Sequence, residues 1–128
     1  NPTSISQVAA EAALNGDQSC ITPMLDAFKT RHRYVVDALN AIPGFKCVDS
    51  GGAFYAFPDA RSAIQDLLAR DVIEQGTDIA FSEYLLESAD VAVVPGSAFG
   101  AEGYIRLSFA TSQGNLEKAL KRIAQALA

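Results

Sequence analysis

The stretch from Val91 to Phe109, VAVVPGSAFGAEGYIRLSF, constrains the fold of this chain more than any other. It opens with four consecutive apolar residues, a pattern typical of a β-strand that is buried on both faces. A Pro-Gly pair ends that strand, and a glycine-rich loop follows. Apolar residues then alternate at positions 105, 107 and 109, which predicts a second strand with one buried face. The stretch therefore predicts a β-sheet.

The polar face of the second strand carries an arginine. Arg106 lies between Tyr104 and Ser108, opposite the alternating apolar residues. One interpretation is a solvated or ion-paired surface arginine, because arginine is seldom buried without a partner. The other is an anion-binding group, since a guanidinium on a rigid strand can form two parallel hydrogen bonds to a carboxylate or phosphate. The strand pattern alone leaves both interpretations open.

Two helices are predicted before this stretch. In the first, within residues 1–14, Ser4 and Gln7 fit a capping box, and Gly16 suits a left-handed position after the helix. Its narrow apolar stripe consists of Ile5, Val8, Ala9 and Ala12. The second helix is predicted to start near Thr22-Pro23 and to end at Pro43-Gly44. Its apolar face consists of Leu25, Phe28, His32, Val35, Leu39 and Ile42.

His32 is the only histidine of the chain. A general base needs a partner within hydrogen-bond reach, and the sequence offers no candidate for that partner. We therefore predict that His32 is a packing residue of the second helix and not a base.

The remaining segments complete an α/β (α+β) fold. Residues 45–49 and 53–58 are predicted to pair as a β-hairpin across a Ser-Gly-Gly turn. Short helices are expected over 62–70 and after Thr77 or Asp78, and Ser112 is expected to cap the last helix. The prediction is a small sheet of about four strands packed under two long helices and the C-terminal helix.

Composition excludes several classes of function. A chain of 128 residues forms one domain that buries roughly two-thirds of its unfolded surface. The net charge of −5 argues against nucleic acid or an anionic membrane as a partner, and the apolar runs are too short to span a bilayer. No signal peptide is recognisable. We expect Cys20 and Cys47 to be buried, reduced thiols of a cytoplasmic protein, because their spacing fits no metal site.

Common catalytic motifs are missing from the sequence. Gly96, Gly100 and Gly103 match neither the dinucleotide-binding fingerprint nor a P-loop, and are predicted to be turn glycines. A single histidine argues against a metal cage or a Ser-His-Asp triad. The four lysines fall at positions that we expect to be exposed, so none is predicted to form a Schiff base. The residues therefore offer recognition without a complete reaction centre.

Five motifs, in order and spacing, resemble a known family. They are NPTSISQ at the start, Arg31-His32-Arg33 in the long helix, GGAFYAFP, LLESADVAVVPGSAFG and YIRLSFATS. Together with the leucine-bearing last helix they are similar to the C-terminal part of class I aminotransferases, pyridoxal-phosphate enzymes of fold type I. The similarity is strongest to aspartate-type aminotransferases of the bacterial kind and covers essentially the whole chain. At His32, however, arginine is common in the family.

The resemblance implies roles for three residues. The family's arginine that binds the substrate α-carboxylate falls on Arg106. The family's segment at the edge of the active-site mouth falls on Ala53 and Phe54. With this resemblance, anion binding becomes the favoured interpretation of Arg106.

The resemblance also implies that the chain is a fragment. Residues 1–128 correspond to the family's small domain, and residues 1–15 to the helix that connects it to the large domain. The Schiff-base lysine and the other groups that hold pyridoxal phosphate would lie before Asn1, and the start with Asn-Pro in place of Met fits that expectation. The complete enzyme would be a cytoplasmic homodimer that exchanges an amino group between an amino acid and a 2-oxo acid.

Two alternatives remain at this point. The first stays within the fold type, as the small domain of a pyridoxal-phosphate-dependent lyase or of an aminotransferase for other amino acids. The second is a free-standing α/β module that uses Arg106 to bind a small anionic ligand.

We expect the 128-residue chain by itself to form no specific imine with pyridoxal phosphate, because no lysine is predicted in a desolvated position. The measurement is the imine absorption band after dialysis, together with an assay for transamination of aspartate with 2-oxoglutarate. A stoichiometric imine band or turnover would contradict the prediction.

Overall fold

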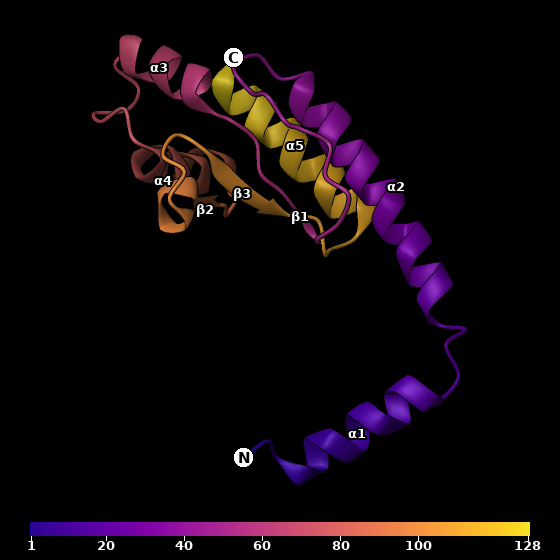
Figure 1. Ribbon diagram of the computed structural model, residues 1–128. Helices are drawn as coiled ribbons and strands as arrows, with labels where there is room; N and C mark the ends of the chain where they lie inside the picture. The colour runs from indigo at the N-terminus through magenta and orange to yellow at the C-terminus, as the bar shows by residue number, and fades with distance from the viewer.

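The computed structural model describes residues 1–128 and contains five α-helices around a small antiparallel sheet (Figure 1). The helices are α1 (Ser4–Asn15), α2 (Ile21–Asn40), α3 (Arg61–Ala69), α4 (Asp78–Ala89) and α5 (Gln113–Leu127), with a 3₁₀-helix η1 (Gly96–Phe99). The strands are β1 (Tyr55–Ala56), β2 (Val94–Pro95) and β3 (Ile105–Ser108). The predicted α/β (α+β) class is confirmed, with three strands in place of about four.

β3 is the central strand of the sheet, with β1 on one side and β2 on the other. Tyr55 of β1 pairs with Ser108, and Val94 of β2 pairs with Arg106. Ile105, Leu107 and Phe109 are buried, whereas the residues between them are partly or fully exposed. The alternation predicted for this segment is therefore confirmed.

A single hydrophobic core joins the buried face of β3 to the helices. Its helical members include Val35 and Leu39 of α2, Phe81 of α4, and Leu120 and Ile123 of α5, all at most 3% exposed. α5 packs against both α2 and α4, and α2 and α5 run side by side in Figure 1. Because burying one large apolar side chain stabilises a fold by about 1.5–3 kcal/mol, this core fixes the backbone of β3.

The predicted hairpin between residues 45–49 and 53–58 does not form. Lys46 makes only an isolated bridge, to Asp59, while β1 pairs with β3. The side-chain amide of Asn40 explains the difference, because it donates to the Cys47 carbonyl oxygen at 2.9 Å and accepts from the Cys47 N–H at 2.8 Å. Both backbone groups of Cys47 are thus satisfied by the end of α2 and not by a neighbouring strand.

The apolar run from Val91 to Val94 is not a strand buried on both faces. Asp90 ends α4 in the left-handed region, and the Val91 N–H donates to the Leu85 carbonyl oxygen, so the run begins as the exit of a helix. Val91 is buried, but Ala92 is exposed. β2 covers only Val94–Pro95 and lies at the sheet edge, where one side has no neighbouring strand.

Two of the predicted helix caps are confirmed. The Thr77 side chain accepts a hydrogen bond from the Ala80 N–H, and the Ser112 side chain accepts one from the Asn115 N–H, each at 3.2 Å. These bonds satisfy N–H groups that have no partner inside the first turn of a helix. α2 begins at Ile21, just before the predicted Thr22-Pro23 start.

The predicted caps of the first helix are wrong, although the helix ends at Asn15, directly before Gly16, as expected. Ser4 lies inside α1, and the N-cap is Thr3, whose side chain makes no capping hydrogen bond. The Gln7 side chain donates to the Pro2 carbonyl oxygen, and not to a cap. Gly16 has extended backbone angles, φ −82° and ψ −170°, because the chain continues into an open connector.

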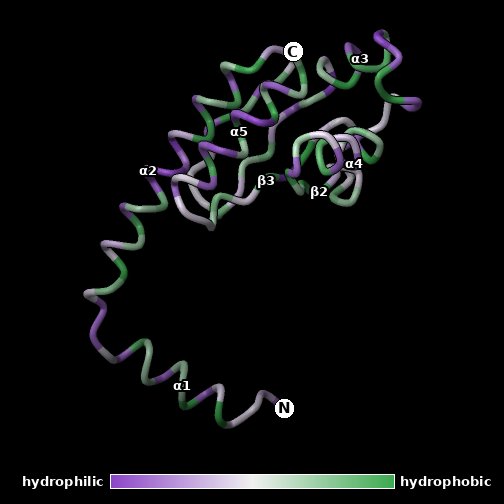
Figure 2. Tube along the Cα trace, turned by 180° about the vertical axis from the view of Figure 1, so that it is seen from behind, coloured by the Kyte–Doolittle hydropathy of each residue, from purple (hydrophilic) through white to green (hydrophobic).

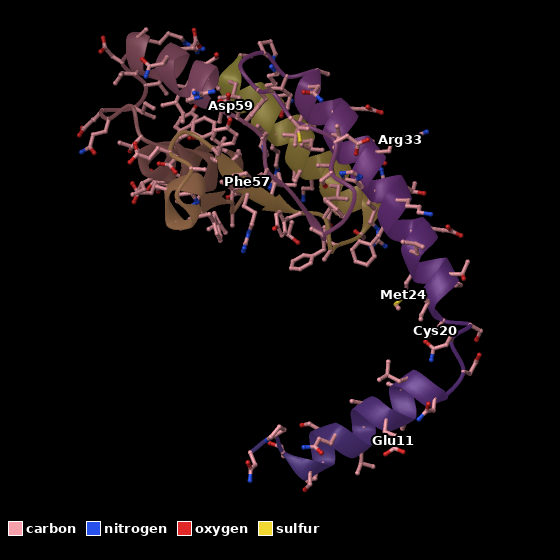
Figure 3. All side chains as sticks on the ribbon, in the orientation of Figure 1. Glu11, Cys20, Met24, Arg33, Phe57 and Asp59 are labelled. Atoms are coloured by element: carbon pink, nitrogen blue, oxygen red, sulfur yellow. The ribbon has the colours of Figure 1, made fainter.

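α1 stands apart from the rest of the molecule in both views (Figures 1 and 2). It contains no buried residue, and Ile5 and Val8 of its predicted apolar stripe are 79% and 67% exposed. Cys20, labelled in Figure 3 on the connector between α1 and α2, is exposed, which corrects its predicted burial. Cys47 is buried as predicted, and this burial raises the pKa of its thiol. None of the five helices combines the length and apolar character needed to cross a membrane.

We predict opposite effects of two glycine-to-alanine substitutions on stability. A Cβ at Gly96 would overlap the carbonyl oxygens of Ala101 and Tyr104, so Gly96→Ala should lower the free energy of unfolding by about 1–3 kcal/mol. A Cβ at Gly114, in the first turn of α5, meets nothing within 4 Å, so Gly114→Ala should raise it by up to about 1 kcal/mol. Urea unfolding measures both, and equal effects would contradict the close packing at Gly96.

Candidate functional site

Arg106 lies at the centre of the candidate site, half-buried on the open face of β3. Its guanidinium carbon is 5.4 Å from the ring centroid of Tyr55 and 4.7 Å from that of Phe99. Tyr55 belongs to β1, and Phe99 to η1, which directly follows β2. The cation is therefore approached by one aromatic ring from each neighbour of the central strand, within the range of cation–π attraction.

The guanidinium of Arg106 has no acidic partner in the chain. The four ion pairs of the structure join His32 to Asp49, Arg61 to Asp59, Arg70 to Asp66 and Arg122 to Asp90. An arginine carries five N–H donors and no acceptor, so these donors remain available to an acceptor from outside. The first interpretation drawn from the sequence was a solvated or ion-paired surface arginine, and its ion-paired form does not describe this side chain.

Tyr104 and Ser108 share the face of Arg106 but make other contacts. The Tyr104 ring stacks on Phe57, with centroids 5.5 Å apart and an interplanar angle of 19°. The Ser108 hydroxyl donates to the Phe54 carbonyl oxygen at 3.4 Å. The side chains that lie against the Arg106 guanidinium are instead the rings of Tyr55 and Phe99.

The two rings differ in how far their contact with Arg106 could be predicted from the sequence. Tyr55 falls within a predicted strand, so the alternation of side chains could have indicated whether it lies on the same face of the sheet as Arg106. Phe99 falls in a glycine-rich loop without periodicity, and nothing in the sequence predicts its contact with a strand seven residues further on.

Phe54 lies close to this arrangement, and Ala53 lies further away. Phe54 is 52% exposed. Its ring packs edge-to-face with the ring of Tyr55, with the two centroids 5.6 Å apart and an interplanar angle of 88°. Tyr55 therefore contacts both Phe54 and Arg106. Ala53 has a left-handed backbone, φ 70°, and lines a shallow recess together with His32 and Phe109. Of the three predicted site residues, Arg106 and Phe54 both contact the Tyr55 ring, whereas Ala53 lies beside α2.

A buried carboxylate fixes the position of η1. Asp78, in the first turn of α4, is 3% exposed, and its Oδ2 accepts a hydrogen bond from the Ser97 N–H at 2.5 Å. The partial positive charge of a helix N-terminus stabilises a carboxylate in that position. The sequence identified Asp78 only as a possible cap. Because Ser97 and Phe99 belong to the same turn, this bond also sets where Phe99 lies.

A second charged pair borders the open face of the sheet. The Arg61 Nε donates to Asp59 Oδ1 at 2.9 Å, and a second guanidinium nitrogen reaches Asp59 Oδ2. The Arg61 guanidinium carbon also lies 5.6 Å from the centroid of the Tyr104 ring. The hydrogen bond from Arg61 is the main cause that lowers the pKa of the Asp59 carboxyl. In contrast to Arg106, this arginine already has its carboxylate.

His32 packs against the core, as predicted. Its ring centroid is 5.3 Å from that of Phe109. Its polar partners, which the sequence did not reveal, lie in the loop after residue 48. His32 Nε2 is 3.5 Å from Asp49 Oδ1 and 3.4 Å from Ser50 Oγ. A Ser-His-Asp relay uses the two different ring nitrogens for serine and aspartate. Here both groups approach the same nitrogen, so the arrangement does not fit a relay.

The chain matches the family model described as aminotransferase class I and II over residues 1–123. It therefore belongs to the family of class I and II aminotransferases. It is 60% identical to an aspartate/prephenate aminotransferase of Nitrosomonas europaea over 127 residues, which make up 99% of this chain and 32% of that protein. It is 50% identical to an aspartate aminotransferase of Geobacillus stearothermophilus over 123 residues, or 96% of this chain and 30% of the relative.

Solved structures of the family share the fold. An aspartate aminotransferase from Rhizobium meliloti matches 98% of this chain and 31% of its own, with a TM-score of 0.82 and 41% identity. An alanine aminotransferase from Pyrococcus furiosus matches 98% of this chain and 30% of its own, with a TM-score of 0.84 and 30% identity. The chain thus spans about a third of the length of the relatives it matches.

The residues of this chain do not fit a pyridoxal-phosphate site on their own. Such a site needs a lysine that can lose its proton in a desolvated position. The four lysines of the chain, Lys29, Lys46, Lys118 and Lys121, are all exposed. The chain therefore lacks a residue suited to be the covalent anchor of the cofactor.

We predict that the Asp59–Arg61 pair contributes acid-sensitive stability. The pKa of Asp59 is lowered below its ordinary value of 3.8, so the contribution is present above that value and is lost as the pH falls through the folded-state pKa. Between about pH 5 and pH 2.5 the free energy of unfolding should fall less steeply in Asp59→Asn than in the unmodified chain. Urea unfolding across this range measures the slopes. Arg61→Gln should flatten the profile in the same way, and equal slopes in all three chains would contradict the prediction.

Proposed function

We propose that this chain is the C-terminal small domain of a pyridoxal-phosphate-dependent aminotransferase of the aspartate type, in which Arg106 binds the α-carboxylate of the substrate. The observation that carries the proposal is a half-buried guanidinium, flanked by two aromatic rings, with no acidic partner in the chain. Arg61, which already holds Asp59, is not equally available.

The chemistry of the substrates fits this role. Amino acids and 2-oxo acids both carry a planar carboxylate next to the carbon at which the amino group is exchanged. A guanidinium can hold a carboxylate by two parallel hydrogen bonds. Holding that end of the substrate orients the reacting carbon, and orientation alone can lower a reaction barrier substantially.

The relatives support binding of a group that their substrates share. The printed names of the matched relatives include aspartate/prephenate, aspartate, aromatic and alanine aminotransferases. The matched structures of the aspartate and alanine enzymes overlap this chain with TM-scores of 0.82 and 0.84. A domain common to such enzymes is suited to bind the α-carboxylate, which is present in every α-amino acid. The aspartate-type assignment follows the printed names of the first matched relatives.

The remaining parts of the enzyme would lie outside these residues. The lysine that holds pyridoxal phosphate and the groups around its ring would belong to a large domain, and the enzyme would be a cytoplasmic homodimer. Residues 1–15 would connect the domains, with the exposed apolar stripe of α1 covered by the large domain. An arginine on a mobile small domain would also couple substrate binding to domain closure and exclusion of water.

The test is the replacement of Arg106 in the full-length enzyme. Truncating one partner of a desolvated, hydrogen-bonded charge pair costs roughly 2–5 kcal/mol, so Arg106→Ala should lower kcat/KM for the amino acid by about a hundredfold or more. Arg106→Lys keeps the charge but loses the two-pronged geometry, and should also be impaired. Steady-state kinetics measures the loss, and a cofactor titration should show an internal imine that is nearly unaffected.

A matched control is Arg31→Lys on α2, where the guanidinium also lies near a ring, that of Phe28 at 5.7 Å. This variant should retain its kcat/KM. An unchanged kcat/KM in Arg106→Ala, or a loss explained entirely by unfolding or by failed cofactor binding, would remove Arg106 from the proposed role.

A further inference from the structure

We propose that Tyr55 and Phe99 are positioning residues, whose rings hold the Arg106 guanidinium in one orientation for a planar carboxylate. This inference rests on the proposed role of Arg106 as the carboxylate-binding residue. It adds two side chains that act on the substrate only through the arginine.

The two rings come from independent elements and meet at one cation. Tyr55 is placed by the pairing of β1 with β3, and Phe99 by η1, on the far side of β3. Their centroids lie 5.4 Å and 4.7 Å from the guanidinium carbon. Two rings that are delivered by β1 and by η1, on opposite sides of β3, restrict the movement of the guanidinium.

Each of these rings is itself held by another ring. Phe54 contacts Tyr55 at 5.6 Å and 88°, and Phe57 contacts Phe99 at 6.1 Å and 85°. Both geometries are the edge-to-face arrangement that aromatic pairs prefer. Phe57, labelled in Figure 3 beside the sheet, contacts Tyr104 as well. The two rings next to Arg106 therefore belong to two separate groups of packed rings, Phe54 with Tyr55 and Phe57 with Phe99 and Tyr104, and neither is an isolated side chain.

Aromatic rings suit this task better than a carboxylate would. A cation is attracted to the face of a ring by the quadrupole of the ring, and that attraction does not require the N–H donors of the guanidinium. An aspartate in the same place would accept hydrogen bonds from the guanidinium, as Asp59 does from Arg61. It would then compete with the substrate for these donors. Two rings can thus restrict the arginine while its donors stay free for a carboxylate.

The position of Phe99 depends on a buried polar contact. Phe99 is 51% exposed, so it is not held by burial. Its turn is fixed by the Ser97 N–H, which donates to the buried Asp78 carboxylate, and by Gly96, where the backbone packs too closely for a side chain. The ring nearest to the guanidinium is therefore placed by α4.

Removal of a ring should weaken substrate binding more than the chemical step. A guanidinium without its rings must be ordered when the substrate binds, and this cost is the same in the ground state and in the transition state. Such a loss raises KM and leaves kcat nearly unchanged. In the full-length enzyme we expect Phe99→Leu and Tyr55→Leu each to raise KM for the amino acid by about tenfold, the scale of one cation–π contact.

Conservative and control variants separate positioning from general packing. Phe99→Tyr and Tyr55→Phe keep a ring over the guanidinium and should retain the KM of the unmodified enzyme. Phe28→Leu removes the ring near Arg31 and should leave kcat and KM unchanged. Should either leucine variant fail to fold, the corresponding methionine variant, which keeps more of the side-chain volume, takes its place.

A double-mutant cycle tests whether the rings act through Arg106. In an Arg106→Ala background, the loss of either ring should lower kcat/KM by less than about twofold, because the group that the ring positions is gone. Losses that simply add to that of Arg106→Ala, or an equal effect of Phe28→Leu, would overturn the inference. Normal KM values in both leucine variants, with Arg106→Ala strongly impaired, would also overturn it and would leave the role of Arg106 intact. An unimpaired Arg106→Ala would instead contradict the proposed function itself.

Discussion

The burial of alternate side chains of β3 is the constraint on which both the core and the candidate site depend. Successive side chains of a strand point to opposite faces of the sheet, so Ile105 and Leu107 enter the core while Arg106 faces outward. Because the buried residues fix the backbone of the strand, the start of the arginine side chain is fixed too. A slip of one residue in register would exchange the two faces and place the guanidinium in the core.

The elements around β3 supply the two rings that lie against the Arg106 guanidinium. β1 supplies Tyr55 through strand pairing, and η1 supplies Phe99 through its attachment to Asp78 of α4. Neither Tyr55 nor Phe99 is a sequence neighbour of Arg106, so the arrangement exists only when the sheet and α4 have assembled. The candidate site is therefore a product of tertiary structure, even though its central residue stands out in the sequence.

This division explains how much the sequence could predict. Arg106 and the alternation around it are local features, as are the caps at Thr77 and Ser112, and all of these were predictable from short patterns. The hairpin prediction failed because the side chain of Asn40, seven residues before Cys47, satisfies the backbone groups that a second strand would have used. The contact of Phe99 with Arg106 could not be predicted, because it depends on a bond between η1 and a different helix.

α1 differs from every other helix of the chain in having no buried residue. Isolated helices shorter than about 12–15 residues are marginally stable in water, and α1, Ser4–Asn15, is no longer than that. Its exposed Ile5 and Val8 add apolar surface that gains nothing from contact with water. The core around β3 contains no residue of α1, so packing against this core does not stabilise the helix. In the proposed enzyme the large domain would cover the apolar stripe of α1, and that contact would stabilise the helix.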